Sequence, residues 1–382
     1  MALISKDLQR KVLLNPGPAT TTDRVKAAQL MPDICPREKE FGQLVETIRR
    51  DLTRIAGGDD RYTTIPFCCS GTGAVEAAIT SAVPPDRSIL IIDNGAYGKR
   101  MIQIAQAFSI PVVPLRYPYG DLPVIDDVAA ALKTDRRISH VAFVHHETTT
   151  GILNPIADLC AVAKKYGAET IVDSMSGFAG IPLSVLDDGI DFLLASSNKN
   201  IQGMAGIGLV ICRLAALEKT KPYPRRNFYF NLWQQYASLQ NTGQFAFTPP
   251  VQVLYALREA IDEFFDQGGV DARHRRYADN WQVLTDGLRQ MGFQLVLPDR
   301  LQSKILTAIL EPADPNYDFD AMHDYLYERG FTIYPGKGAA KGDTFRLANM
   351  GAVDAQDMRD FLKTLQDALR HMGVKNLAPK SS

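Results

Sequence analysis

The sequence predicts an α/β fold in which a mainly parallel sheet is followed by a smaller α+β unit. Over the first part of the chain, short apolar segments alternate with segments of helical pattern. These segments are apolar at nearly every position, and the alternation stops near residue 268. Near-continuous apolar strands separated by helices are typical of a parallel sheet that is covered on both faces.

The elements of this sheet follow one another in a regular order. The expected strands are 88–93, 111–117, 139–146, 169–174 and 191–196. The expected helices between them are 97–108, 124–133 and 156–167. The segment 206–213 comes next after a short turn, and we expect it to lie antiparallel to the last strand. The aromatic-rich segment 220–247 breaks the order and is expected to be a long loop that lines a site or a subunit contact.

The rest of the chain predicts the smaller unit. Its expected helices, after one at 249–268, are 272–291, 318–329 and 353–371. Its expected strands are 293–298, 304–310, 331–336 and 344–349. The chain is therefore expected to comprise an N-terminal segment that packs on the small domain, a large domain, a small domain and a tail, at residues 1–18, 19–268, 269–375 and 376–382.

Composition excludes several classes of function. The formal net charge of the 382 residues is −1, so no overall basic field attracts nucleic acid or acidic membranes. The five cysteines form no CxxC pair, and their odd number suits a reducing cytoplasm better than a disulfide framework. The N-terminus is too charged for a signal peptide, and no apolar run reaches transmembrane length.

Polar motifs stand where ligands of such a sheet bind, outside the carboxyl ends of the strands. The stretch SGTGAVEAAI at 70–79 predicts a phosphate site, because the backbone N–H groups of such a turn and the positive end of a helix attract an anion. The alternative is simple capping of a helix by Ser70 or Thr72.

Further polar residues follow the later strands. Tyr97 begins a helix after a turn, where its ring could face a planar ligand or be an ordinary aromatic residue. The stretch HHETTTG at 145–151 offers donors around a ligand, but its adjacent histidines point to opposite faces of a strand and make a poor metal site. Asp173 ends one strand and Lys199 follows the next. Taken alone, Asp173 is more simply the cap of the next turn, and Lys199 is more simply a surface lysine.

Together these features predict pyridoxal 5'-phosphate as the cofactor and no metal. A phosphate cradle anchors it, an aromatic ring stacks on its pyridine, and a carboxylate keeps its ring nitrogen protonated. A lysine holds its aldehyde as a Schiff base and later moves protons.

The motifs resemble those of the fold type I, class V aminotransferases. The motifs that carry the resemblance are LLNPGPATTT, SGTGAVEAAI, NGAYGKRM, HHETTTGILNPI, IVDSMSGFAGIP, SSNKNIQG, IYPGK and FRLANMG. The resemblance implies a mainly parallel seven-stranded sheet in a cofactor-binding large domain. It also implies transamination between a small aminophosphonate and a 2-oxo acid, and a homodimer with shared active sites.

The resemblance also assigns roles to the residues around the cofactor's ring. It implies that Lys199 forms the Schiff base and that Asp173 pairs with the pyridinium nitrogen. Tyr97 takes the ring-stacking place, and Thr148 contacts the phenolic oxygen of the cofactor.

Anion-binding roles follow from the same resemblance. Ser70, Gly71 and Thr72 are expected to hold the cofactor's phosphate. Thr248 is expected to reach the phosphate of the neighbouring subunit's cofactor. Arg346 is the expected arginine for a substrate carboxylate or phosphonate, because a planar guanidinium suits either anion.

The sequence departs from the family pattern where substrates are chosen. Phe-Ala-Phe at 245–247 stands where Trp-Arg-Phe is familiar, so a cation is lost. The segment 33–41 gains Arg37, which we expect to replace the missing charge.

Alternatives to this reaction stay open at the level of the sequence. Another class V aminotransferase, of the alanine–glyoxylate type or for another aminophosphonate, would share the cofactor residues. A pyridoxal-phosphate lyase starts from the same bound state. A non-enzymatic α/β binding protein has no use for the lysine at position 199.

Overall fold

The computed structural model describes residues 11–336 and 342–379. The first ten residues of the expected N-terminal segment, the lysine of the IYPGK motif and the last three residues of the expected tail lie outside the described residues.

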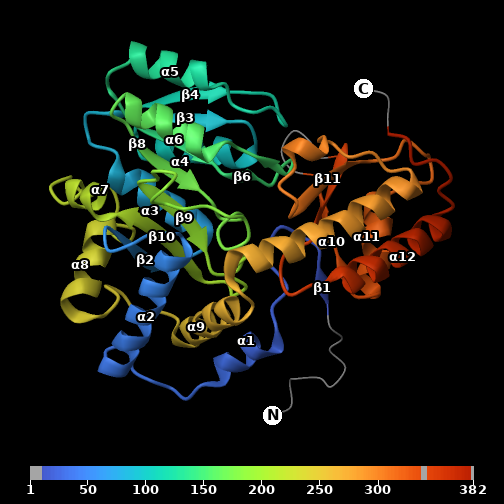
Figure 1. Ribbon diagram of the computed structural model, residues 1–382, viewed down its shortest axis with the longest axis horizontal. Helices are drawn as coiled ribbons and strands as arrows, with labels where there is room; N and C mark the ends of the chain where they lie inside the picture. The colour runs from blue at the N-terminus through green and yellow to red at the C-terminus, as the bar shows by residue number, and fades with distance from the viewer. Residues whose placement is uncertain (1–10, 337–341, 380–382) are drawn as a thin grey trace.

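A seven-stranded sheet forms the centre of the first unit and lies in the left-hand part of Figure 1. Its strands, in spatial order, are β2 (Tyr62–Cys68), β10 (Ile207–Arg213), β9 (Phe192–Ser196), β8 (Glu169–Asp173), β5 (Ile138–Val144), β3 (Ser88–Asp93) and β4 (Val112–Arg116). β10 is antiparallel to both of its neighbours, and the other pairs are parallel. The predicted fold class, including the antiparallel strand, is confirmed.

Helices cover both faces of this sheet. The helices of this unit are α1 (Asp23–Ala27), η1 (Ala28–Leu30), α2 (Lys39–Ile55), α3 (Gly71–Ala82), α4 (Ala96–Ala107), α5 (Ile125–Thr134), α6 (Ile156–Lys165), α7 (Leu214–Lys219), α8 (Leu232–Thr242) and α9 (Val251–Asp266). Ile171 and Val172 of β8 are both fully buried. Because consecutive side chains of a strand point to opposite faces, neither face of the sheet is open to solvent at β8.

The structure corrects two predictions in this unit. The segment 220–247 is not one long loop, because α8 occupies its centre, with an N-terminal cap from Asn231 and a left-handed Gly243 at its end. β2 was missed, since Pro66 interrupts its apolar pattern. β2 is the edge strand of the sheet, where a proline is tolerated.

The second unit has its own sheet and its own hydrophobic core. Its helices are α10 (Gly269–Met291), η2 (Asp299–Leu301), α11 (Phe319–Glu328) and α12 (Ala355–Met372). Its three-stranded sheet has the order β11 (Leu306–Leu310), β14 (Thr344–Ala348) and β13 (Tyr334–Pro335). Figure 1 shows α10 running from the first unit across to this second unit.

Two predicted strands of the second unit differ from the structure. The expected strand 293–298 is reduced to an isolated bridge between Leu295 and Ile309. The expected strand 331–336 is divided into β12 (Phe331–Thr332) and β13, which pair with different partners. The domain boundaries predicted from the sequence stay predictions.

The described part of the N-terminal segment connects the two units. β1 (Val12–Leu13) pairs in parallel with β12 of the second unit. A few residues later the N–H of Ala19 donates to the carbonyl of Asn198, 2.9 Å away, in the first unit. Residues 14–18 therefore pass directly beside the turn that carries Lys199.

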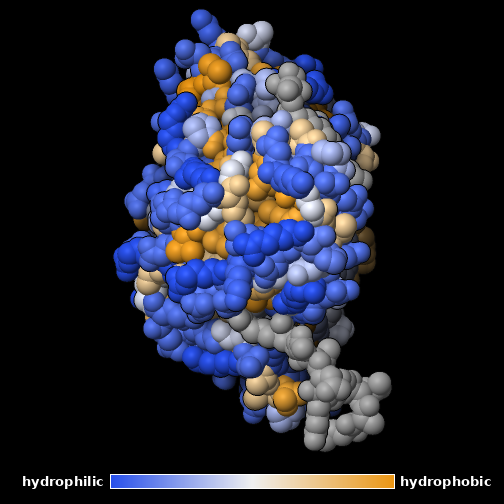
Figure 2. Space-filling view, turned by 90° about the vertical axis from the view of Figure 1, so that its right-hand side faces the viewer, coloured by the Kyte–Doolittle hydropathy of each residue, from blue (hydrophilic) through white to orange (hydrophobic). Residues whose placement is uncertain are grey.

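The surface is mostly polar on the side that shows the second unit. Figure 2 shows hydrophilic residues over most of this face, with hydrophobic residues exposed in smaller areas between them. No helix in the described part of the chain is long and apolar enough to cross a membrane.

Candidate active site

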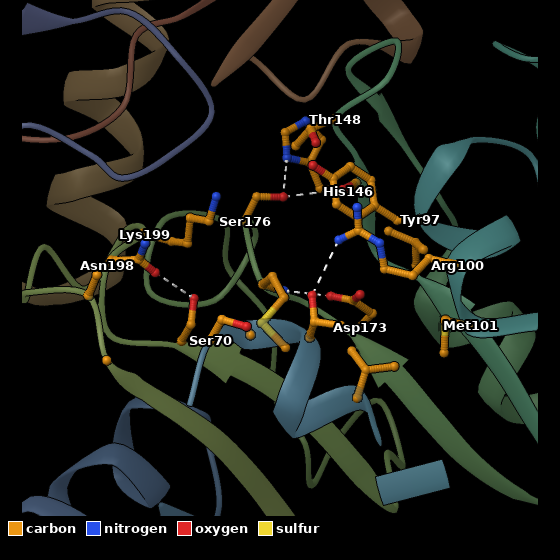
Figure 3. Close-up of a pocket in the computed structure, with 18 residues that line it drawn as sticks. Ser70, Tyr97, Arg100, Met101, His146, Thr148, Asp173, Ser176, Asn198 and Lys199 are labelled. Carbon is orange, nitrogen blue, oxygen red and sulfur yellow. Dashed lines mark hydrogen bonds between the residues drawn. The ribbon is translucent and has the colours of Figure 1, made fainter. Parts of the chain in front are cut away.

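A cavity of about 430 Å³ lies at the carboxyl ends of the central strands. Its volume falls in the range of small-molecule and cofactor sites. The predicted residues that line it are Ser70, Gly71, Thr72, Tyr97, Thr148, Asp173 and Lys199. Figure 3 shows the labelled residues among them around one hollow, although they come from five separate segments of the chain.

One wall of the cavity is an anion cradle at the start of α3. Ser70 is the N-terminal cap residue of α3, and its side chain makes no capping hydrogen bond to the helix. The guanidinium of Arg100 donates to the hydroxyl of Thr72 at 3.3 Å and adds a positive charge. A Cβ on Gly71 would lie 2.5 Å from the sulfur of Met175, so the wall is shaped for glycine at this position. A helix N-terminus with an arginine beside it suits a phosphate.

Asp173 lies at the end of β8, and only 4% of its surface is exposed. The N–H of Met175 donates to its carboxylate at 3.0 Å. Burial raises the pKa of Asp173 to about 6, and the nearby carboxylate of Glu147 also raises it, whereas Arg100 and Lys199 lower it. A carboxylate in this setting gains from a cationic partner in the cavity.

Lys199 reaches the cavity from the turn after β9. Its amine donates to the carbonyl of Pro16 at 2.6 Å, so the N-terminal segment positions it. The backbone of Gly17 lies against the lysine side chain, and a Cβ there would stand 2.1 Å from Nζ. A Cβ at this point of the LLNPGPATTT motif would displace the lysine, and the φ of +133° at Gly17 itself favours glycine.

Tyr97 and Arg346 lie together at one side of the cavity. The guanidinium of Arg100 lies over the Tyr97 ring, 5.0 Å from its centroid. Arg346, on β14, is 4% exposed and donates from Nη1 to the carbonyl of Thr148 at 3.1 Å. Burial lowers the pKa of Arg346, whereas Tyr97 and Glu147 raise it. Arg346 does not itself line the cavity, but it contacts Thr148, which does.

Sequence reasoning missed other residues that line the cavity. Arg100 stands in the same motif as Tyr97 and one helical turn further on, and this spacing places both side chains on one face of α4. His146 is bound through Nδ1 to Ser176 at 3.0 Å and through Nε2 to Ser303 at 2.8 Å. Burial lowers the pKa of His146 to about 3, so the imidazole is neutral. No pattern in the sequence predicts the hydrogen bond between His146 and Ser303, which belongs to the second unit.

The structure does not bring Thr248 and Arg37 to this cavity. Thr248 is exposed, and its carbonyl accepts a weak hydrogen bond from Cys68 at 3.7 Å. Arg37 is exposed and donates to the carbonyl of Phe245 at 2.8 Å. Neither residue lines the cavity.

Comparison with known proteins assigns the family. The sequence profile described as aminotransferase class-V matches residues 27–351. The chain belongs to the class-V aminotransferase family. The 2-aminoethylphosphonate–pyruvate transaminase of Burkholderia thailandensis is 41% identical over 363 residues, which cover 95% of this chain and 98% of that protein. The enzyme of the same name from Syntrophobacter fumaroxidans is 40% identical, with coverage of 95% and 97%.

Solved structures of aminotransferases share the fold. The alanine–glyoxylate aminotransferase of Nostoc sp. superposes with a TM-score of 0.90 at 24% identity, covering 97% of this chain and 98% of that one. The pyridoxamine–pyruvate aminotransferase of Mesorhizobium loti gives a TM-score of 0.88 at 23% identity, with coverage of 97% and 95%. The prediction of a fold type I aminotransferase that uses pyridoxal phosphate is confirmed.

The cavity of this class-V aminotransferase fits that cofactor. The helix N-terminus with Arg100 suits the phosphate, and Gly71 leaves room there for the side chain of Met175. The buried carboxylate of Asp173 suits a protonated ring nitrogen, and Lys199 offers the amine for the aldehyde.

Alanine at position 17 is expected to impair the enzyme through Lys199. The new Cβ would push the amine away from its place, and a misplacement of about 1 Å costs on the order of 100-fold in rate. We expect kcat to fall by at least about tenfold for Gly17→Ala in steady-state assays. Gly292→Ala is the control, because Gly292 has a similar φ of +107° but its new Cβ would meet only Leu377, at 3.7 Å. Equal rates for the two variants would contradict the packing of Gly17 on the amine of Lys199.

Proposed function

We propose that this enzyme transfers an amino group between 2-aminoethylphosphonate and pyruvate, giving phosphonoacetaldehyde and L-alanine, or runs the reverse reaction. The observation that carries the proposal is the buried guanidinium of Arg346 beside the cavity. In the part of the chain that the structure describes, no carboxylate forms a salt bridge with it. The guanidinium donates to the carbonyls of Thr148 and Pro335, and the nearby carboxylate of Glu147 offsets part of the cost of its burial. A substrate phosphonate or carboxylate would add an anion at contact distance. The relatives that share 40–41% identity carry the same activity in their names.

The residues of the cavity divide the work of this reaction. When bound, pyridoxal phosphate supplies an aldehyde that accepts an amine and a ring that accepts electrons. We assign to Lys199 the transfer of the proton from the amine-bearing carbon of the first substrate to the cofactor carbon that would receive the amino group, and the reverse transfer for the 2-oxo acid. Asp173 keeps a proton on the ring nitrogen, and Tyr97 packs on the ring face. Thr148 offers its hydroxyl to the phenolic oxygen of the cofactor. Arg346 orients the substrate by binding its anionic group.

We also propose that the active unit is a homodimer with shared sites. Phe247 stacks on Tyr229 with ring centroids 4.9 Å apart and contacts Phe228, which is 71% exposed. Phe247 directly precedes the exposed Thr248 in the chain. A second subunit that covers these aromatic residues would receive Thr248 at its own cofactor's phosphate. Arg37, which is hydrogen-bonded to the carbonyl of Phe245, would arrive with the same segment.

The same proposal places the enzyme in the cytoplasm. All five cysteines are free thiols, and two of them, Cys160 and Cys212, are buried in the core of the first unit. Unpaired thiols in these numbers suit a reducing compartment.

A half-reaction tests the substrate directly. Purified enzyme loaded with pyridoxal phosphate is mixed with 2-aminoethylphosphonate, and the absorbance of the cofactor is followed as it changes to that of the pyridoxamine form. We expect this conversion with 2-aminoethylphosphonate and with L-alanine. Conversion by L-alanine alone would point to another class-V aminotransferase, and release of ammonia or of the phosphonate group would point to a lyase.

Removing the guanidinium of Arg346 is expected to damage both half-reactions. Loss of a buried group that binds an anion typically costs about 100-fold in kcat/KM, and both substrates carry an anionic group close to the amine-bearing carbon. Single-turnover kinetics of Arg346→Ala with 2-aminoethylphosphonate and with L-alanine measure this. Unchanged kinetics would remove Arg346 from the anion site.

Arg37→Ala is the matched variant for the second cation. A phosphonate carries more charge than a carboxylate near neutral pH, so we expect Arg37→Ala to slow 2-aminoethylphosphonate more than L-alanine. Equal losses for the two amines would exclude Arg37 from the choice of substrate.

A further inference from the structure

The turn that presents Lys199 has a strained backbone. It is closed by a hydrogen bond from the N–H of Gln202 to the carbonyl of Lys199 at 2.9 Å, and the N–H of Gly203 bonds to the carbonyl of Ser197 at 2.8 Å. Gln202 has a φ of +63°, a left-handed conformation that residues other than glycine rarely adopt. Such a conformation persists only when contacts from the surrounding structure hold it.

Those contacts come from α10, the helix that joins the two units. The side-chain amide of Gln202 donates to the hydroxyl of Tyr277 at 2.7 Å. Arg273, one turn earlier on the same helix, donates to the carbonyl of Asn200 at 2.6 Å. Tyr277 is fully buried and Arg273 is 1% exposed, so water does not compete for these bonds. The turn is thus fixed by α10 at Asn200 and Gln202.

The hydroxyl of Tyr277 also binds the segment that follows the strand of Arg346. It accepts a hydrogen bond from the N–H of Gly351 at 3.0 Å. The carbonyl of Tyr277 accepts one from the side chain of Asn349 at 2.7 Å. Asn349 and Gly351 come directly after β14, which carries Arg346. The hydroxyl oxygen of Tyr277 therefore contacts both the turn that carries Lys199 and the segment that follows the strand of Arg346.

We propose that Tyr277 is a positioning residue whose hydroxyl couples the turn of Lys199 to the strand of Arg346. This inference rests on the proposed roles of those two residues in the reaction. A displacement of the second unit that moves Arg346 therefore also changes, through Tyr277, the position of the Lys199 amine. The hydroxyl touches no reacting atom, so its effect on the rate arises from geometry alone.

Hydrogen–deuterium exchange of the full chain without cofactor or substrate tests the coupling for Tyr277→Phe. The amides of Gln202 and Gly203 bond within the turn and not to Tyr277, so their exchange reports the turn itself. We expect both to exchange about tenfold faster in the variant, together with Gly351. Tyr62→Phe is the control, since its buried hydroxyl also makes two hydrogen bonds, to the carbonyls of Val185 and Ile190. Faster exchange at Gly351 alone would overturn the proposal.

Kinetics of the loaded enzyme give an independent result. Gln202→Gly relieves the strained φ and removes the side chain that binds Tyr277. We expect kcat to fall about tenfold in Tyr277→Phe and in Gln202→Gly, and no further in the double variant, because both remove one link. Tyr62→Phe should retain its rate. Independent, multiplying losses would contradict the coupling. Failure of the proposed substrate would leave the exchange result unaffected, so the two outcomes can be told apart.

Discussion

Replacing Lys199 with alanine is expected to abolish turnover while the protein stays folded. Lys199 is the amine at the end of β9 that faces the cradle and Asp173, and no other lysine lines the cavity in the described part of the chain. We expect the rate of Lys199→Ala to fall below about one ten-thousandth of wild type, the scale on which loss of a covalent nucleophile acts. The side chain is half-buried and donates to the carbonyl of Pro16, so circular dichroism and Tm should change little when it is removed.

Chemical trapping checks the assignment of Lys199 in the wild-type enzyme. Borohydride reduction of the loaded enzyme should fix the cofactor to the peptide that contains Lys199, and peptide mass spectrometry locates the label. Lys304→Ala is the matched control, because this lysine lies over the ring of Trp281 outside the cavity and should keep full activity. A label on another lysine would refute the assignment.

Asparagine at position 173 is expected to keep the shape of the site and lose its charge. Without the carboxylate the ring nitrogen of the cofactor loses its proton, so the ring accepts electrons less well. We expect kcat to fall by about 100- to 1000-fold, as for the loss of one preorganised electrostatic contact. Cofactor binding, measured by absorbance or fluorescence titration, should persist. A rate near that of wild type would show that Asp173 only caps the turn at Met175.

The same variant should stabilise the protein in the absence of cofactor at neutral and alkaline pH. The pKa of Asp173 is raised from its ordinary value of 3.8 to about 6, so the folded state disfavours the ionised carboxylate. This cost is absent well below pH 4, grows between the two values, and is complete above about pH 6. It is on the order of 2–3 kcal/mol at most, since one pKa unit corresponds to about 1.4 kcal/mol. Urea unfolding of wild type and Asp173→Asn without cofactor, at pH 4 and pH 8, measures it, and an equal difference at both pH values would contradict the buried charge.

The sequence by itself determined the sheet and the residues that its strands present. The apolar strands and the helices between them specify a parallel sheet, and parallel strands place their carboxyl ends at one edge. Asp173, Lys199 and the start of α3 could therefore be assigned to one site without coordinates, because each directly follows a strand or begins a helix there. The sequence did not predict β2, because a proline interrupts its apolar pattern. It did not predict α8, because this helix lies in a segment rich in aromatic residues without a clear helical pattern.

The tertiary structure alone decided which distant groups contact the predicted residues. Arg346 reaches the carbonyl of Thr148 across 198 residues of sequence, and Lys199 reaches that of Pro16 across 183. Tyr277 lies on a helix whose polar pattern gave no sign of a buried hydroxyl that joins two segments. Local periods report which face of an element is buried. The partners of a buried polar group depend on how separate elements pack, because each such group takes whichever donor or acceptor the packing places within reach.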